Sequence, residues 1–304
     1  MKKEKAVGPL YCVLAALIWG LSFVAQKTGA HIGTFTFNGI RTVIGGLVLI
    51  PVLVISQIKK NKNLPAGEKT KFDYKGMFRG GLVCGTVLFV ASNLQQHAFT
   101  YEIEAGKVAF ITALYMMLVP LFGLFLKKRP SPNVWAGIVL GVIGLYFICV
   151  KKGDFALGKG EIFSLLCAAA FAVHIIVIDK YCMEVESVPL ACGQFLVAGI
   201  FSVICMFIFE EPSLPDIVDS AIPILYAGIG SSAIAFTLQI FGQKYTQPAV
   251  AALLMCLESV FAVIFGWLIL HDDMGVRVLV GCGIMFAGVI LTQIPVGNKK
   301  QGAD

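Results

Sequence analysis

The sequence has few charged residues for its length. Only 14% of its 304 residues are Asp, Glu, Lys or Arg, whereas 58% are hydrophobic, and the mean hydropathy is +0.84. A soluble globule of this size needs more polar surface than these residues supply. The composition therefore excludes a soluble domain and indicates an integral membrane protein.

Motifs that bind metals or nucleotides are also missing. The nine cysteines form no C-x-x-C pair, which indicates packing residues rather than metal ligands or disulfides. Residues 153–160 approach a phosphate-binding loop, but they lack the Ser or Thr that would follow Lys159 and hold magnesium. No H-E-x-x-H or comparable cluster occurs. We therefore expect no cofactor, no metal site and no enzymatic activity.

Ten long apolar stretches are present instead. Each has about 18 to 23 residues, enough to cross a hydrocarbon core about 30 Å thick. They lie near residues 9–26, 35–57, 77–98, 106–126, 133–150, 161–179, 188–209, 219–242, 248–270 and 276–295. The glycines and prolines inside them do not prevent helix formation in a membrane. The sequence predicts an all-α integral membrane protein with ten transmembrane helices.

The second half of the chain repeats the first. Positions that recur 144 residues later are Leu94-Gln95, Tyr101, Ala105, Gly137 and Gly144, which become Leu238-Gln239, Tyr245, Ala249, Gly281 and Gly288. Because each half holds an odd number of stretches, the second half enters the membrane from the opposite side. This predicts two inverted five-helix repeats, residues 1–152 and 161–304, joined by an outer linker at 153–160. Inverted repeats are typical of secondary transporters.

Basic residues predict the orientation in the membrane. With a cytoplasmic N-terminus, 17 Lys and Arg lie on the inner side, many of them in or next to a basic loop at residues 58–76, against 6 outside. This bias places both termini in the cytoplasm of a multi-pass plasma-membrane protein. It also explains the net charge of +6 without nucleic-acid binding.

Small residues one helical turn apart allow close helix contacts. Examples are Gly81/Gly85, Gly137/Gly141 and Ala227/Ser231. We expect these pairs to pack inside the chain, and a homodimer through one such face is the alternative.

Two ionisable residues lie deep inside predicted spans, where a charge is costly unless it faces a cavity or a partner. Glu258 is near the middle of its stretch, at the depth where transporter sites lie. Arg41 lies about 9 Å below the outer edge, at about 1.5 Å per residue, and its guanidinium suits a carboxylate. Their counterparts in the other half are Leu114 and Gln194. We predict roles in substrate contact or coupling, with structural hydrogen bonding or snorkelling as the alternatives.

Polar side chains form a stripe on each of two predicted helices. Asn93, Gln96 and His97 share one helical face, and Gln239 and Gln243 are one turn apart. The stripes predict the walls of one central cavity. Ordinary hydrogen bonding between helices is the competing interpretation.

Three further residues are candidates for the same cavity. His174, near the middle of the sixth span, can relay protons, or it can be a neutral, hydrogen-bonded packing residue. Trp19 and Tyr115 can stack on a substrate, although aromatic residues in membrane helices also serve packing.

Several segments resemble the EamA branch of the drug/metabolite transporter (DMT) superfamily. They are Phe110-Ile111-Thr112-Ala113-Leu114-Tyr115, Val119-Pro120, Thr237-Leu238-Gln239 and, above all, Ala252-Leu253-Leu254-Met255-Cys256-Leu257-Glu258-Ser259-Val260-Phe261-Ala262. The resemblance covers residues 9–295. It implies ten helices in two inverted repeats, with a cavity lined chiefly by spans 1, 3, 4, 6, 8 and 9. Similar proteins move amino acids, amines, carboxylates and other small metabolites, often outward.

The resemblance also bears on single residues. Glu258 matches a glutamate of the family's ninth span. The proline that usually follows it is Ser259 here, so the family's kink is not predicted from this sequence. The acidic residues often found after the fourth and ninth spans are replaced by Lys127-Lys128-Arg129 and by His271-Asp272-Asp273. The first replacement removes an expected charge partner at the cytoplasmic face.

Together these features predict a secondary active transporter that exports or exchanges a small polar metabolite, with an amino acid as the first candidate. Alternating access would move the repeats around a cavity in the lipid bilayer, with a proton or sodium ion as a coupling partner. A channel-like or lipid-translocating protein and a metabolite uptake permease are the alternatives.

Overall fold

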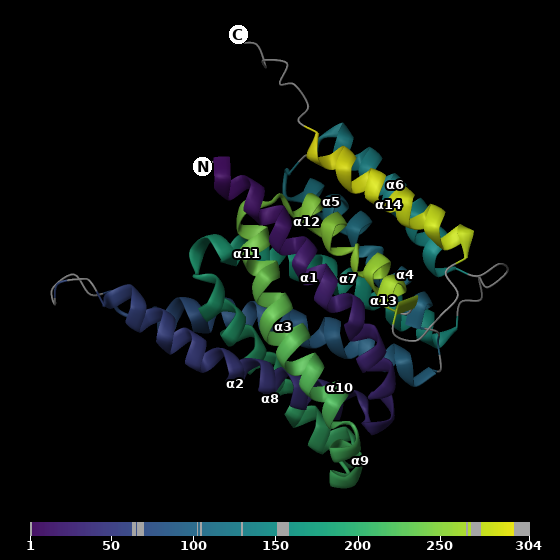
Figure 1. The fold of residues 1–304 in the computed structure, drawn as a ribbon. Coiled ribbons are helices and arrows are strands. Elements are labelled where there is room, and N and C mark those ends of the chain that lie inside the picture. The colour runs from purple at the N-terminus through teal and green to yellow at the C-terminus, as the bar shows by residue number, and fades with distance from the viewer. Residues whose placement is uncertain are drawn as a thin grey trace.

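The computed structural model describes residues 2–62, 65, 70–101, 103, 105–128, 130–150, 158–265, 267–268 and 275–294 (Figure 1). Most of the predicted outer linker and the centre of the basic loop at 58–76 lie outside these residues. Arg129 and the segment His271-Asp272-Asp273 lie outside them as well.

Every element in the described part of the chain is helical. The first half contains α1 (Lys2–Thr28), η1 (Ala30–Ile32), α2 (Thr34–Asn61), α3 (Tyr74–Ala98), η2 (Phe99–Tyr101), α4 (Ala105–Ala113), α5 (Tyr115–Phe125) and α6 (Pro132–Cys149). The second half contains α7 (Lys159–Glu184), α8 (Ser187–Phe209), α9 (Leu214–Asp219), α10 (Ala221–Leu225), the π-helix η3 (Tyr226–Phe236), α11 (Thr237–Tyr245), α12 (Pro248–Met255), α13 (Glu258–Phe265) and α14 (Val276–Gln293).

Nine segments of the described chain are long and apolar enough to cross a membrane. They coincide with nine of the ten predicted stretches. The other stretch, predicted at 133–150, forms α6, whose apolar part Pro132–Ile148 is shorter than the nine. The 18 residues of α6 rise about 27 Å at about 1.5 Å per residue, which is close to the thickness of a hydrocarbon core.

Large apolar side chains lie exposed on the surface, and the interior holds many polar side chains beside its hydrophobic clusters. Phe125, Phe207 and Phe209 are 86%, 70% and 69% exposed, whereas Gln96 and Gln194 are fully buried. Such a distribution suits a lipid environment, in which polar groups must find partners inside the protein.

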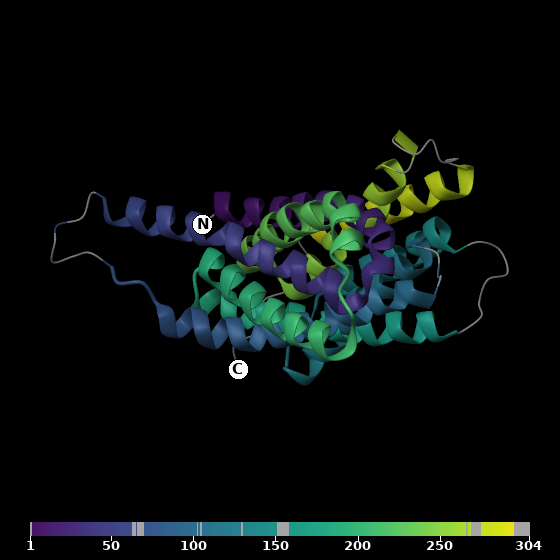
Figure 2. The same cartoon turned by 90° about the horizontal axis from the view of Figure 1, so that it is seen from below.

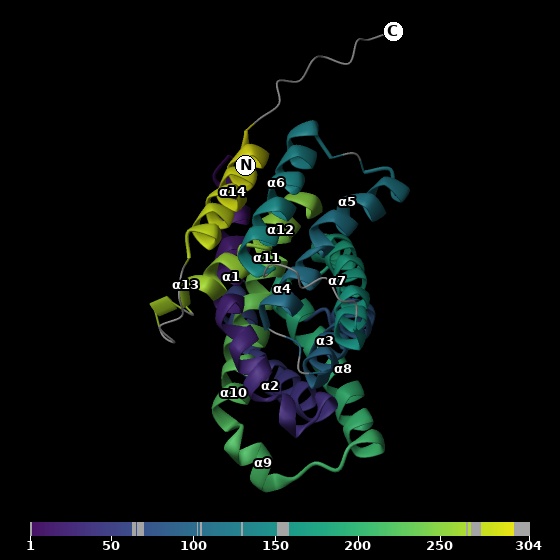
Figure 3. The same ribbon diagram turned by 90° about the vertical axis from the view of Figure 1, so that its right-hand side faces the viewer.

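The helices pack in pairs drawn from both halves. α2 lies against α8, α3 lies against α7 and α8, and α1 lies against α11 and α13. α6 and α14 run side by side at one edge of the bundle (Figures 1 and 3). The first turn of α1 and the last turn of α14 lie at the same end of the bundle (Figures 1 and 2).

Glycines at repeat-matched positions form the contact between α6 and α14. A methyl group on Gly144 would lie 2.8 Å from the carbonyl oxygen of Gly281, and one on Gly281 would lie 2.8 Å from the carbonyl of Gly144. Gly137 and Gly288 meet in the same way, at 2.7 Å in each direction. These positions require glycine because the two backbones touch.

Replacing Gly281 should therefore separate α14 from α6. We expect Gly281→Leu to destabilise the protein by about 1–3 kcal/mol, the usual cost of overpacking, measured as a lower midpoint of thermal unfolding in detergent. Gly283→Leu on the same helix is the control, since no atom lies within 4 Å of a methyl group built there. Equal midpoints for the two variants would contradict the close contact.

Candidate functional site

A buried cavity lies at the centre of the bundle. It is lined by Trp19, Ser22, Phe23, Gln26, Arg41, Gln95, Thr112, Tyr115, Phe171, Ile175, Ser231, Phe236, Gln239, Met255 and Glu258. The resemblance implied a lining from spans 1, 3, 4, 6, 8 and 9, and most of these residues lie in the corresponding helices α1, α3, α4, α5, α7, η3, α11, α12 and α13. Arg41 comes from α2. The cavity has a volume of about 50 Å³, which is room for a few waters.

Two spans are broken beside this cavity. The first break separates α4 from α5 at Leu114, and the second separates α12 from α13 at Cys256 and Leu257. At both breaks the backbone tightens, because the amide of Leu114 donates to the carbonyl of Ile111 and the amide of Leu257 donates to that of Leu254. Leu114 and Glu258, the first residue of α13, are counterparts in the sequence repeat.

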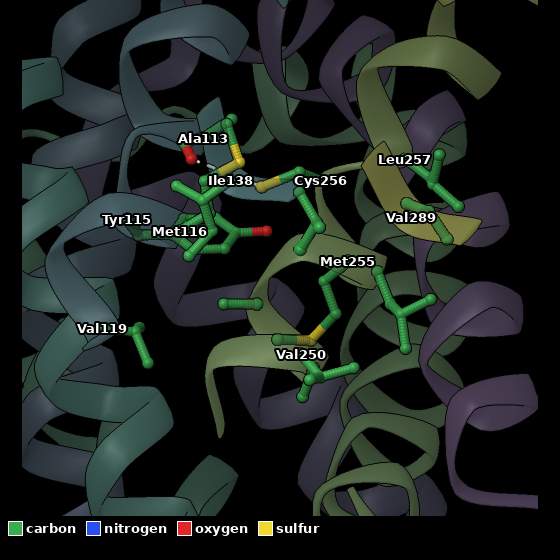
Figure 4. Packing of buried hydrophobic residues seen from close by; sticks show 14 of the residues in the cluster. Ala113, Tyr115, Met116, Val119, Ile138, Val250, Met255, Cys256, Leu257 and Val289 are labelled. Atoms are coloured by element: carbon green, nitrogen blue, oxygen red, sulfur yellow. Dashed lines mark hydrogen bonds between the residues drawn. The ribbon is translucent and has the colours of Figure 1, made fainter. Parts of the chain in front are cut away.

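The two breaks contact each other directly. The Cys256 thiol donates to the carbonyl oxygen of Ala113 over 3.3 Å, which satisfies a backbone group at the end of α4 (Figure 4). Met116 and Met255 pack in the same hydrophobic cluster. The helix is thus broken before Ser259 without the proline that the family usually has there.

Glu258 is buried at this junction. Only 6% of the residue is exposed, and its carboxyl group lies beside the Tyr115 side chain, with which it interacts. Because Glu258 begins a helix, the amide dipoles of α13 favour a negative charge there. The site therefore combines an acid, a phenol and an interrupted backbone at one point.

Arg41 lines the same cavity from α2 and is 4% exposed. Its Nε donates to Asn38 Oδ1 over 2.6 Å. Asn38 in turn donates to Asn93 Oδ1 over 3.1 Å, and Asn93 donates to Ser202 Oγ over 3.0 Å. Among the described residues, no carboxylate forms an ion pair with Arg41, and the hydrogen-bond acceptor of its Nε is the neutral side chain of Asn38.

Gln239 and Gln243 form a chain of amides that leads away from the cavity. Gln239 Nε2 donates to Gln243 Oε1 over 2.9 Å, and Gln243 Nε2 donates to the carbonyl of Ile175 over 2.8 Å. Gln239 lines the central cavity, whereas Gln243 lines a second pocket of about 580 Å³ between α5, α7, α11 and α12.

The structure brings together five of the ten predicted site residues around the central cavity, namely Trp19, Arg41, Tyr115, Gln239 and Glu258. It places Asn93, Gln96, His97, His174 and Gln243 outside this lining. The α3 stripe differs from the expectation most clearly. Asn93, Gln96 and His97 do share a face, but that face contacts neighbouring helices, and Gln95 is the α3 residue that lines the cavity.

Each displaced residue has partners elsewhere. Gln96 Nε2 donates to the carbonyl of Gln26 over 3.0 Å. His97 lies within 3.3 Å of Thr34 Oγ1, in a separate pocket near the ends of α2 and α8. His174 is fully buried, with Nε2 3.1 Å from Gln194 Oε1. These contacts fit the hydrogen-bonding alternative that the sequence left open.

Five polar residues that line the cavity were not among the predicted site residues: Ser22, Gln26, Gln95, Thr112 and Ser231. Serine and threonine in a membrane helix often bond their own backbone, so their spacing carries little signal. Gln26 lies near the predicted end of its span, where a polar residue is unremarkable.

The sequence model of the EamA-like transporter family matches residues 6–150 and again residues 158–294. The chain belongs to the EamA-like transporter family. It is accordingly a multi-pass membrane protein of a family whose members are transporters.

Relatives from distant organisms support this assignment. The chain is 21% identical over 294 residues to the uncharacterized transporter YoaV of Bacillus subtilis (strain 168), covering 95% of this chain and 97% of the relative. It is 27% identical over 296 residues to the WAT1-related protein At3g02690, chloroplastic, of Arabidopsis thaliana, covering 92% and 68% respectively. Protein PecM of Dickeya dadantii (strain 3937) is 24% identical, over 64% of this chain and 66% of its own.

A solved crystal structure also has a similar fold. It superposes with a TM-score of 0.77 at 18% identity, covering 95% of this chain and 96% of the other. At this identity the likeness shows the fold alone.

The Arg41 network gives a prediction about stability. Asn38→Leu removes the acceptor for Arg41 Nε and the donor to Asn93, so we expect a loss of about 1.5–3 kcal/mol, as for a hydrogen bond to a charged group. Thermal unfolding in detergent measures it. Gln293→Leu, an exposed amide on α14, is the control and should leave the midpoint unchanged. An unaltered midpoint for Asn38→Leu would show that the network does not hold Arg41.

Proposed function

We propose that this protein is a secondary active transporter of the plasma membrane that exports or exchanges a small polar metabolite. One observation carries the proposal. Arg41 and Glu258, a basic and an acidic residue, line a single buried cavity beside two broken spans. Broken helices around a polar site at mid-depth are typical of secondary transporters. Because one group suits an anion and the other a cation, amino acids are the first substrate class to test.

The proposed topology has ten spans in two inverted repeats, residues 1–152 and 161–304. In this scheme α4 with α5 forms the fourth span, α12 with α13 forms the ninth, and α6 forms the fifth. The matched positions of the two breaks support it, as does a family model that matches once in each half. Both termini and the basic loop at 58–76 would face the cytoplasm.

The size of the cavity supports alternating access. The cavity has room for only a few waters, so the helices would move apart to admit an amino acid. Contacts at both ends of the bundle would change in this movement. Lys128 pairs with Asp179 near the larger pocket. At the other end Glu210 accepts hydrogen bonds from the amides of Phe35 and Thr36, at 2.9 and 2.7 Å.

In this scheme the cavity residues have different roles. Arg41 would bind the anionic group of the substrate, and Glu258 would couple transport to a proton or sodium ion. Trp19 and Tyr115 would pack against the substrate. The residues outside the lining, Asn93, Gln96, His97, His174 and Gln243, would hold these groups in place.

Transport by purified protein in liposomes tests the proposal. We expect saturable flux of at least one member of a panel of amino acids and other small metabolites, and we expect Glu258→Gln to abolish that flux without changing the unfolding midpoint. Glu184→Gln, which alters an exposed carboxylate at the end of α7, should transport at the wild-type rate.

Other results would point elsewhere. Absence of flux for the whole panel would refute the transporter, and flux that never saturates would favour a channel. Wild-type flux in Glu258→Gln would make this acid a structural residue.

Orientation is tested by labelling. Lys71 lies in the basic loop and Asp216 lies in α9, and both are exposed. In intact cells a membrane-impermeant maleimide should label Asp216→Cys, whereas Lys71→Cys should react only after permeabilisation. Wild-type protein gives the background from native cysteines. The reverse labelling pattern would place the termini outside.

A further inference from the structure

Gln239 lines the central cavity and carries an acceptor oxygen that has no partner. The residue is 2% exposed and lines the cavity, and its amide nitrogen is already used in the bond to Gln243. Its Oε1 has no hydrogen-bond partner. A buried acceptor without a donor is costly, so this oxygen indicates a ligand that brings an N–H or O–H group.

The orientation of this amide is fixed by its neighbours. The carbonyl of Ile175 can only accept, so the Gln243 nitrogen must point toward it and the Gln243 oxygen toward Gln239. A flipped Gln239 would place its oxygen against the oxygen of Gln243. The chain from Ile175 through Gln243 therefore holds the Gln239 nitrogen toward Gln243 and leaves the Gln239 oxygen as the unpaired atom.

Two more acceptors line the same cavity. Gln26 Oε1 is buried and also lacks a partner, and Glu258 supplies a carboxylate. The three acceptors come from α1, α11 and α13. An ammonium group has three donors and no acceptor, whereas a hydroxyl has only one donor, so an ammonium group matches this set better.

Aromatic rings complete the surroundings. Trp19 and Phe236 meet edge to face with centroids 4.8 Å apart, and Phe171 and Tyr115 line the same cavity. The faces of aromatic rings attract cations, and this attraction strengthens away from water. Arg41 lines the same cavity, and its guanidinium suits an anionic group of the same ligand.

We infer that Gln239 is a specificity-determining residue that binds the protonated amine of the substrate together with Glu258, and that Gln243 is the positioning residue that keeps the Gln239 oxygen toward it. This inference rests on the proposed function, because it takes the bound molecule to be the transported substrate. The inference itself concerns binding. It predicts that the protein distinguishes amines from hydroxyl analogues of the same shape.

Matched ligand pairs test this. Thermal stabilisation of the purified full-length protein is titrated with L-phenylalanine against L-phenyllactate, and with L-leucine against L-2-hydroxyisocaproate, which differ in the amine alone. Phenethylamine, which has no carboxylate, is added as a third probe. We expect at least one amine-bearing probe to be preferred over its hydroxyl partner by about tenfold or more, the scale set by an unpaired buried group.

The variants separate Gln239 and Gln243 from general packing. Gln239→Leu should reduce the preference to about twofold or less, because no acceptor remains at this position. Gln243→Leu should weaken the preference for the amine although Gln239 is intact. If Gln239→Leu does not fold, Gln243→Leu tests the inference on its own. Gln194→Leu alters a fully buried amide outside the cavity and should keep the wild-type preference.

The outcomes are distinguishable from those of the transport assay. Stabilisation by none of the amines, equal affinity for both members of each pair, or an unchanged preference in Gln239→Leu overturns the inference, even if the protein transports a hydroxy acid. Amine-selective binding that depends on Gln239, in a protein that shows no flux, upholds the inference and refutes the transporter.

Discussion

A hydrocarbon environment offers no water to a polar group, and this constraint governs the structure. Every backbone or side-chain polar atom at membrane depth needs a partner inside the protein. The broken spans show how strictly this holds, because the carbonyl of Ala113 at one break accepts from the Cys256 thiol at the other. Each break is tolerated because it lies against its counterpart, and Glu258 starts a new helix at that place.

The same requirement separates structural polar groups from those available for binding. Asn38, Asn93 and Ser202 satisfy one another through a network that joins α2, α3 and α8. By contrast, Ser22 Oγ, Gln26 Oε1 and Gln239 Oε1 lack partners, and all three residues line the central cavity. Buried polar atoms without partners also occur elsewhere, as at Gln96 and Thr246, but among the described residues only these three belong to side chains that line the central cavity.

Hydropathy and spacing predicted much of this architecture. The apolar stretches coincide with helices, and the glycines at 144-residue spacing form the α6–α14 contact. Single-residue placement was less predictable. Asn93 and Gln95 lie on different faces of α3 and both are polar, so the sequence alone does not show which face lines the cavity. The break before Ser259 was not predictable either, because no proline marks it, and its thiol contact and tight backbone bonds leave no signal in the sequence.

The π-helix η3 has a consequence for any helical wheel drawn through the eighth span. Its hydrogen bonds reach one residue further than those of an α-helix, so each turn adds a residue and shifts the rotational phase of everything that follows. A wheel with 3.6 residues per turn, started at Ala221, therefore assigns the wrong azimuth to Gln239. The winding of residues 226–236 sets which side chains of α11 point inward, and an insertion or deletion there would turn a different face toward the cavity.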